Sequence, residues 1–334
     1  MPSGIMAVTW AKKAVCNKKT HNETQPNNMR KIIAIGESVL DTVFRAGQPV
    51  RAMVGGRIAC ATALLGSRGL PCSMVSECCT DSVGDLVVDF LKRNHVDVRS
   101  VDRFTDGATA LSAIFQDDDC ATQRIVNYGR YPKERFDVVW PRIDEDDVLI
   151  FGSLYAIDLP QRERLFELVK HAVERKAIIV YLPGFQHGIN FRITKVMPAI
   201  LENLELAHVV IAHDRDLTDI FSGETGEEAF HNHIEYYGGN CLHIHPDLAV
   251  TRMIQEHRTH LPAAGEPTPH MLLWQAAFVA GVVEQLFASE VTYQSLPDMD
   301  DDAWRDILRN AQQLAHQCVT QNPTFNNTLT LPRQ

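Results

Sequence analysis

Short apolar segments alternate with longer amphipathic segments along most of the chain. The short ones predict buried strands at Ile32–Ile35, Met74–Val75, Val148–Phe151, Ile178–Tyr181 and Val209–Ile211. The longer ones have apolar residues at helical spacing and predict helices at Cys60–Leu70, Val83–Asn94, Leu159–Arg175, Ile193–Leu204 and Leu272–Leu286. Strands that are apolar throughout and separated by helices are typical of a parallel sheet covered on both faces. The pattern therefore predicts an α/β fold.

Two stretches, residues 41–56 and 108–131, interrupt this alternation. Ala110, Ser112 and Ile114 alternate with Leu111 and Ala113, which is the period of a strand with two different faces. The acidic run 117–119 predicts a turn, and 124–128 predicts a return strand. We expect a small antiparallel flap inserted into the parallel domain.

The two ends of the chain differ from its middle. Residues 1–28 are polar and basic, without an apolar segment long enough for a signal peptide, and predict a disordered tail or a mis-assigned start codon before Met29. A functional basic arm is the alternative interpretation. We expect one domain over residues 29–325, with the lid segments inside it, and a short tail over 326–334.

The composition narrows the classes of partner. The chain has 334 residues and a formal net charge of -10 without a basic stripe, which disfavours nucleic-acid binding. No stretch reaches the roughly 18 uninterrupted apolar residues of a membrane span, so we expect no membrane insertion. The eight cysteines are scattered and form no CxxC pair. Reduced thiols and a cytoplasmic location are therefore the expectation.

A series of motifs resembles a known family. Gly36–Asp41 follows the first strand, Gly55–Cys60 opens a helix, Thr80–Asp85 opens the next, and Gly107–Thr109 leads a flap strand. Each motif is weak alone, but their order and spacing resemble the ribokinase-like, PfkB-type carbohydrate kinases from about Lys31 to Pro323. The resemblance implies a three-layer α/β/α domain with a Rossmann-like central sheet and a small β-sheet lid over a sugar site.

The resemblance also implies a set of substrate-binding residues. Asp41 matches the family aspartate that hydrogen-bonds a sugar hydroxyl. Gly55 and Gly56 match the paired glycines that let the backbone approach the sugar, since glycine has no Cβ. Cys60 stands where the family usually has a sugar-contacting Asn, and a thiol is a poorer hydrogen-bonding partner. Thr109 matches a common threonine of the lid.

The family's second signature, Gly-Ala-Gly-Asp, is altered here. By position, Leu273, Trp274 and Gln275 replace its first three residues, and Ala276 replaces the catalytic aspartate. The glycines normally present helix N-terminal N–H groups to the phosphate, and the aspartate takes the proton from the attacking hydroxyl. Alanine cannot accept a proton, and we expect the Leu273 and Trp274 side chains to crowd the phosphate path. We therefore predict no catalytic residue at position 276.

Three further departures fall in the nucleotide half. Where the family often has Asp-Pro-Asn-x-Arg, this chain has Leu-Pro-Gly-Phe-Gln at residues 182–186. Where the family has Asn-x-x-Glu, this chain has His-Asp-Arg-Asp at residues 213–216. Residues 243–249, at the position of the family's glycine-rich nucleotide turn, contain no glycine. All three point to a decayed nucleotide and phosphate site beside a partly retained sugar site. Asp214, Asp216 and Glu266 are the carboxylates we consider as replacements for the missing base.

Histidines suggest a separate hypothesis. Nine of the 14 lie between His208 and His270, and the pairs 231/233 and 243/245 would each share one face of an extended segment. No cysteine cluster or carboxylate spacing accompanies them, so we expect solvated histidines and no metal site.

Three functions of different classes remain open. The first is a sugar- or polyol-binding protein with weak or lost phosphotransfer, that is, a pseudokinase. The second is an active sugar kinase with a remodelled anion hole, for which the resemblance implies ATP and Mg²⁺. The third is a structural or regulatory dimer, formed through the lid. In the first two, the partner is a small-molecule sugar or polyol.

Overall fold

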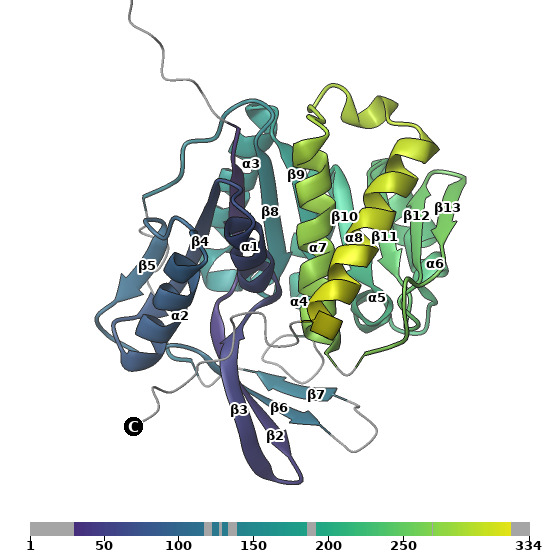
Figure 1. The fold of residues 1–334 in the computed structure, drawn as a ribbon. Coiled ribbons are helices and arrows are strands. Elements are labelled where there is room, and N and C mark those ends of the chain that lie inside the picture. Colours follow the sequence, from purple (N-terminus) through teal and green to yellow (C-terminus); the bar gives the residue numbers. More distant parts are fainter. Residues whose placement is uncertain are drawn as a thin grey trace, which may run out of the picture.

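A nine-stranded sheet runs through the middle of the molecule (Figure 1). The computed structural model describes residues 30–116, 122–126, 129–132, 139–185, 192–268 and 270–321. The strands lie in the order β13 (His257–Leu261), β12 (Val250–Ile254), β11 (Asn240–Ile244), β10 (Val209–His213), β9 (Ile178–Pro183), β8 (Val148–Ser153), β1 (Ile32–Ile35), β4 (Cys72–Cys79) and β5 (Val101–Phe104).

The sheet is mixed, which corrects the prediction of a parallel sheet. Neighbouring strands are parallel from β11 to β5, but β12 and β13 pair antiparallel at the other edge. The sequence pattern missed these edge strands because polar residues such as Arg252 of β12 and Thr259 of β13 interrupt their apolar positions. A continuous apolar run is the signal of a central strand with both faces covered.

Helices cover both faces of the sheet and make a three-layer domain. One layer contains α1 (Arg57–Ser67), α2 (Ser82–Arg93), α7 (Met271–Ala288) and α8 (Asp301–Gln321). The other contains α3 (Arg162–Glu174), α4 (Ile193–Leu206), α5 (Asp214–Ile220) and α6 (Gly226–Ala229). Within β1, Ile32 and Ala34 pack toward the first layer, while Ile33 and Ile35 pack toward the second. This alternation is the period-2 geometry of a strand.

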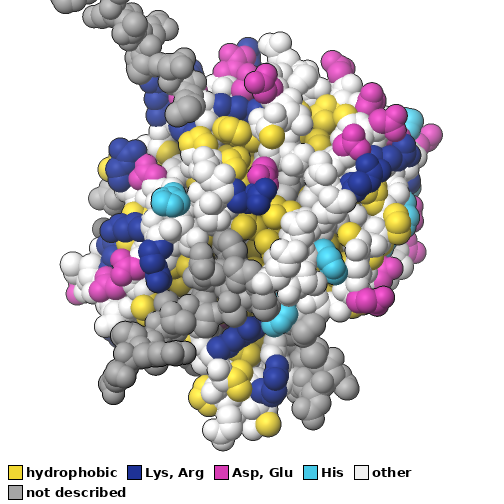
Figure 2. Space-filling view, in the orientation of Figure 1, with side chains coloured by type: hydrophobic (Ala, Val, Ile, Leu, Met, Phe, Trp, Pro, Cys, Tyr) yellow, Lys and Arg dark blue, Asp and Glu magenta, His cyan; other side chains and the backbone are white. Residues whose placement is uncertain are grey.

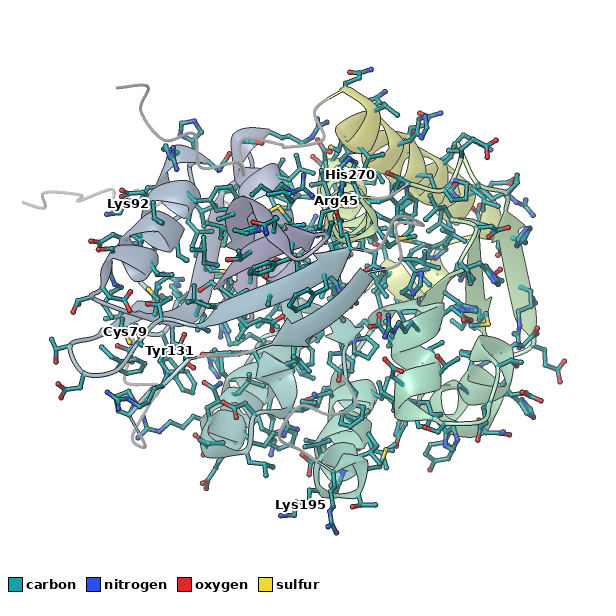
Figure 3. All side chains as sticks on the ribbon, turned by 90° about the horizontal axis from the view of Figure 1, so that it is seen from below. Arg45, Cys79, Lys92, Tyr131, Lys195 and His270 are labelled. Atoms are coloured by element: carbon teal, nitrogen blue, oxygen red, sulfur yellow. The ribbon has the colours of Figure 1, made fainter. Side chains whose placement is uncertain are left out.

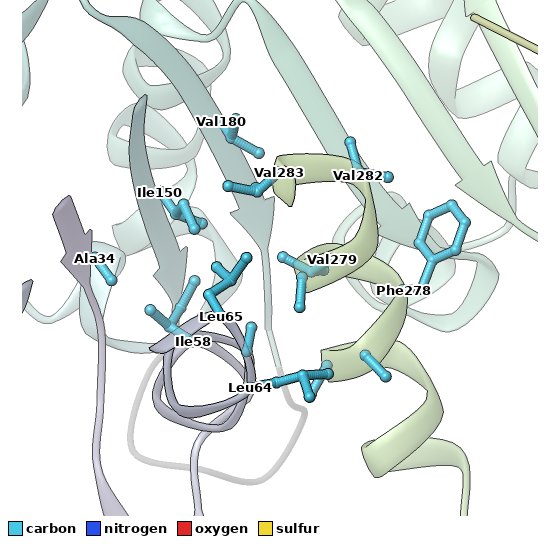
Figure 4. Close-up of a cluster of buried hydrophobic side chains, with 14 of the residues drawn as sticks. Ala34, Ile58, Leu64, Leu65, Ile150, Val180, Phe278, Val279, Val282 and Val283 are labelled. Atoms are coloured by element: carbon cyan, nitrogen blue, oxygen red, sulfur yellow. The ribbon is translucent and has the colours of Figure 1, made fainter. Parts of the chain in front are cut away.

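Helices α1 and α7 pack side by side against the sheet (Figure 4). Leu64 and Leu65 of α1 belong to the same buried cluster as Val279 and Val283 of α7. In the described part of the chain, α7 is the one helix long and apolar enough to cross a membrane, and most of it is buried inside the protein.

A smaller sheet projects from one end of the domain and forms the lid. Its four strands lie in the order β3 (Gln48–Gly55), β2 (Val39–Arg45), β6 (Leu111–Gln116) and β7 (Thr122–Val126). The structure thus joins the two interrupting stretches in one sheet, as predicted, although the central pair β2 and β6 is parallel. The predicted turn at 117–119 and residues 127–128 lie outside the described residues.

The contact between α7 and α8 generates a stability prediction. A Cβ placed on Gly281 of α7 would lie 2.6 Å from Ala311 Cα of α8, so any side chain there must push the helix backbones apart. We expect Gly281→Val to lower the free energy of unfolding by about 1–3 kcal/mol, the usual cost of overpacking. Urea unfolding measures this change. Gln317→Ala, on the exposed side of α8, serves as the control, and equal stabilities of the two variants would contradict the prediction.

Candidate binding site beneath the lid

A cavity of about 390 Å³ lies where the lid meets the main domain. Its walls come from lid strands β2, β3 and β6, from the segments that follow β8, β9 and β10, and from the first turns of α7. The carboxyl ends of parallel strands are the usual place for a ligand in an open α/β sheet. The cavity therefore lies where the fold favours a binding site.

Asp41 lies on β2 with its side chain almost fully buried at the cavity wall. The hydroxyl of Ser112, on the neighbouring strand β6, donates a hydrogen bond to Asp41 Oδ1. A Cβ on Gly55 would lie 2.1 Å from Asp41 Oδ2, so only glycine leaves room for the carboxylate. The paired strands β2 and β3 thus hold one acidic group at the cavity by close backbone approach.

Gly56 makes the turn from lid strand β3 into helix α1. Its φ of 98° lies in the left-handed region, and a Cβ there would lie 2.2 Å from the carbonyl oxygen of Glu37. Cys60 follows in the first turns of α1, and its thiol lies 3.5 Å from Val54 O. The structure brings Asp41, Gly55, Gly56 and Cys60 together at the cavity, as the sequence motifs suggested.

Thr109 is placed differently from the expectation. Its hydroxyl accepts a hydrogen bond from Cys79 N at 2.8 Å and donates one to Asp81 Oδ1 at 2.7 Å. Asp81 is the N-cap of α2, so Thr109 fixes the start of that helix. Thr109 is not among the residues that line the cavity, and its hydroxyl is already used within the protein.

The start of α7 also differs from the expectation. The helix begins at Met271, so Ala276 lies in its second turn, is 2% exposed and belongs to the core rather than the cavity wall. Trp274 stacks on Phe278 with ring centroids 5.3 Å apart, so it does not crowd the cavity, whereas Leu273 does line it. Gln275 also reaches the cavity, and its Oε1 atom is buried without a hydrogen-bonding partner in the described structure.

A buried ion pair crosses the cavity floor. Arg57 at the start of α1 donates to both oxygens of Asp216 in α5, at 2.7 and 2.9 Å, and the two side chains are 18% and 10% exposed. Burial opposes the charge of Arg57, but the carboxylate outweighs it and raises the pKa of the guanidinium. Asp216 Oδ2 also accepts the backbone N–H of His213 at 3.0 Å.

Asp216 stands where the family glutamate would help to bind a metal and phosphates. Both of its oxygens already accept hydrogen bonds, and the neighbouring guanidinium would repel a divalent cation. In the part of the chain that the structure describes, no group of three or more His, Cys, Asp or Glu side chains is arranged to hold a metal ion. The residues present therefore do not fit the Mg²⁺ that the resemblance implies.

His213 contributes a neutral imidazole to the cavity. Burial is the main cause that lowers the pKa of this side chain. Its Nδ1 accepts the N–H of Arg215 at 3.1 Å, which leaves the proton on Nε2. No hydrogen-bonding partner for Nε2 is present among the described residues. His213 thus has an N–H group available to a ligand.

The sequence motifs missed Glu37, which lines the cavity, and suggested two carboxylates that do not line it. Glu37, inside the first motif, accepts hydrogen bonds from Ser153 Oγ at 2.7 Å and Tyr155 N at 3.2 Å. Its position two residues after the end of the first strand could have indicated that it lies at the binding edge of the sheet. Of the other carboxylates considered as a base, Asp214 accepts a hydrogen bond from His243 Nε2 at 3.0 Å, and neither Asp214 nor Glu266 lines the cavity.

The ion pair predicts a large effect on stability. Arg57→Met leaves the Asp216 carboxylate buried without its partner, so the free energy of unfolding is expected to fall by about 3–5 kcal/mol. The double variant Arg57→Met/Asp216→Leu is expected to lose less than Arg57→Met alone. Arg305→Met, which removes an exposed pair with Asp302, should change stability by less than about 1 kcal/mol. Additive effects of the two cavity substitutions would contradict a direct pair.

Comparisons with known structures agree with this architecture. The crystal structure of aminoimidazole riboside kinase from Salmonella enterica superposes with a TM-score of 0.70 at 16% identity, over 89% of this chain and 100% of that one. Fructokinase from Vibrio cholerae O395 gives 0.71 at 15% identity, over 88% and 99%. Fructokinase from Xylella fastidiosa gives 0.70 at 17% identity, over 90% and 95%. At these identities the likeness establishes the fold, which is ribokinase-like.

The family itself follows from the sequence comparison. No curated protein sequence matches the chain significantly. Residues 29–236, more than half of the chain, match the family model described as pfkB family carbohydrate kinase. This match covers the first strand, the whole lid and the sheet as far as β10, which build the cavity except for the wall formed by the start of α7 and the residues before it. The chain belongs to the pfkB family of carbohydrate kinases.

Proposed function

We propose that this protein binds a sugar or polyol in the cavity around Asp41 and transfers phosphate to it slowly or not at all. The observation that carries the proposal is the Asp41 carboxylate, buried at the cavity wall in a space that only Gly55 leaves open. A buried carboxylate strongly favours hydrogen-bond donors, and the hydroxyl groups of a polyol supply them in the required number.

The rest of the cavity suits the same class of ligand. Gln275 Oε1 accepts hydrogen bonds, while His213 Nε2 donates one. Met53, Ile114 and Phe185 add apolar wall. A polyol presents hydroxyls on its edges and C–H groups on its faces, so it would use both kinds of surface. Among the similar structures, one aminoimidazole riboside kinase crystal contains aminoimidazole riboside with an ATP analogue, and one fructokinase crystal contains fructose with ADP.

Slow transfer is inferred from the state of the carboxylates in the cavity. Glu37 accepts from Ser153 and Tyr155, Asp216 is paired with Arg57, and Asp219 is paired with Arg215. Protein groups already engage these three carboxylates, which leaves them less accessible to the proton of a substrate hydroxyl. Absence of an effective general base typically costs a factor of about 10²–10⁴ in rate.

Binding is tested by calorimetry of the purified protein against a panel of sugars and alditols that includes neutral and anionic members. We expect at least one to bind, and Asp41→Asn to weaken it about 10-fold or more, because a charged acceptor becomes a neutral amide. Gly55→Ala should have a similar effect by displacing the carboxylate. Asp89→Asn, on the exposed face of α2, is the matched control. Absence of binding by every member of the panel would refute the proposal.

Phosphotransfer is tested with ATP and Mg²⁺ on any sugar that binds. We expect turnover well below about 1 s⁻¹, the lower end of the usual enzyme range. Ala276→Asp should not restore activity, because residue 276 is buried in the core, and the variant should instead melt at a lower temperature. Turnover at about 1 s⁻¹ or faster in the unmodified protein would favour an active kinase with a remodelled anion hole.

A structural or regulatory dimer is the second candidate, and the outer face of the lid favours it. Phe44 and Phe115 stack there with ring centroids 5.1 Å apart, and Val50 is 52% exposed. Phe115 is 37% exposed as well, and exposed apolar side chains that gather on one surface are typical of interaction sites. Sedimentation equilibrium should give a dimer mass for the unmodified protein and a monomer mass for Phe115→Glu. A monomer in both cases would exclude this candidate.

A further inference from the structure

One arginine at the cavity has no acidic partner among the described residues. Three arginines line the cavity, and two of them face carboxylates, Arg57 with Asp216 and Arg215 with Asp219. The guanidinium of Arg51, on lid strand β3, makes no hydrogen bond or ion pair with any of the described residues. A partly buried cation without a counter-charge is unfavourable unless it serves a ligand.

The surroundings of Arg51 add positive charge. Burial and the neighbouring Arg45 both lower the pKa of Arg51, in that order of importance. Burial, Arg51 and Arg45 likewise lower the pKa of His270. Figure 3 shows Arg45 and His270 next to each other, and Figure 2 shows basic side chains and a histidine gathered around the lid. The lid end of the cavity is therefore electropositive.

The first turn of α7 lies at the same end of the cavity. His270 is the N-cap residue of this 18-residue helix, and its side chain makes no capping hydrogen bond to the first turn. Helix N-terminal N–H groups favour an anion. The buried Gln275 Oε1 atom, one turn further on, has no hydrogen-bond donor in the described structure. This end of the cavity thus offers sites for an anion and, beside them, an acceptor for a hydroxyl.

The strand geometry relates this end to Asp41. Asp41 and Val43 lie on the cavity face of β2, and Arg51 pairs with Val43 across the hairpin. Two residues along a strand span roughly 7 Å, so Arg51 is displaced by about that distance from Asp41 along the lid. The carbon chain of a single sugar molecule can span the distance between Asp41 and Arg51.

We infer that the ligand is an anionic sugar, in which a carboxylate or phosphate group lies between Arg51, His270 and the start of α7 while hydroxyls reach Asp41 and Gln275. The inference rests on the proposed function and narrows its substrate class. Arg51 acts here as a specificity-determining residue for the anionic group, because its positive charge attracts an anion more strongly than a neutral hydroxyl.

The test compares matched ligands that differ in charge. Glucitol, gluconate and glucitol phosphate, and the corresponding ribitol series, are titrated into the full chain by calorimetry at low ionic strength. We expect at least one anionic member to bind about 10-fold or more tightly than its neutral counterpart, as for a charge-assisted hydrogen bond. Added salt should reduce this preference. The carboxylate and phosphate members distinguish the two sources of the anion.

Substitutions at the lid end of the cavity test which residues cause the preference for an anionic ligand. Arg51→Gln should lower the affinity for the anionic ligand much more than the affinity for the neutral one, and so abolish the preference, while His270→Gln should reduce the preference. Arg309→Gln, on the exposed face of α8, is the matched control. Equal affinities of charged and neutral ligands, or a preference that survives both substitutions, would overturn the inference and leave the proposed function standing.

Two other results separate the remaining cases. If no ligand binds, charged or neutral, the proposed function itself fails. If inorganic phosphate or ATP binds with an affinity that depends on Arg51 and no sugar competes, the electropositive end serves a nucleotide, and the inference of an anionic sugar is wrong.

Discussion

The turn at Gly55 and Gly56 is the constraint on which the rest of the site depends. At this turn lid strand β3 ends and helix α1 begins, with a φ of 98° at Gly56. The lack of a Cβ on Gly55 leaves space for the Asp41 carboxylate, and the lack of one on Gly56 allows contact with the backbone of Glu37. A side chain on Gly55 would displace the Asp41 carboxylate within the lid, and one on Gly56 would push the turn away from the backbone of Glu37. The turn therefore sets the distance between the lid and the carboxyl ends of the strands.

The same turn directs Arg57 across the cavity floor. As the first residue of α1, Arg57 reaches Asp216 at the start of α5 and pairs with both of its oxygens. The pair connects the helix layers on the two faces of the sheet. It also occupies both oxygens of the Asp216 carboxylate, which would otherwise be open to a cation. One interaction thus stabilises the architecture and alters the chemistry available beside it.

The order of the motifs predicted which residues of the first hairpin and α1 meet at the cavity better than it predicted the start of α7. Asp41, Gly55, Gly56 and Cys60 are close in sequence and lie on one hairpin and the helix that follows it, so local structure is enough to bring them together. Thr109 and Trp274 were misplaced because their side chains point into the protein, toward Asp81 and Phe278. Which face of an element a residue occupies depends on where that element begins, and α7 begins at Met271.

The sequence by itself determined the α/β class, the central strands β1, β8, β9 and β10, and the lid, because continuous apolar runs and period-2 segments are local signals. Only the tertiary structure decided the antiparallel edge of the sheet, where partly polar strands resemble loops. It alone also decided that Arg57 meets Asp216, 159 positions away, and that Arg51 meets no carboxylate among the described residues. Charge pairing between distant segments depends on packing, since a list of charged residues does not show which ones become neighbours.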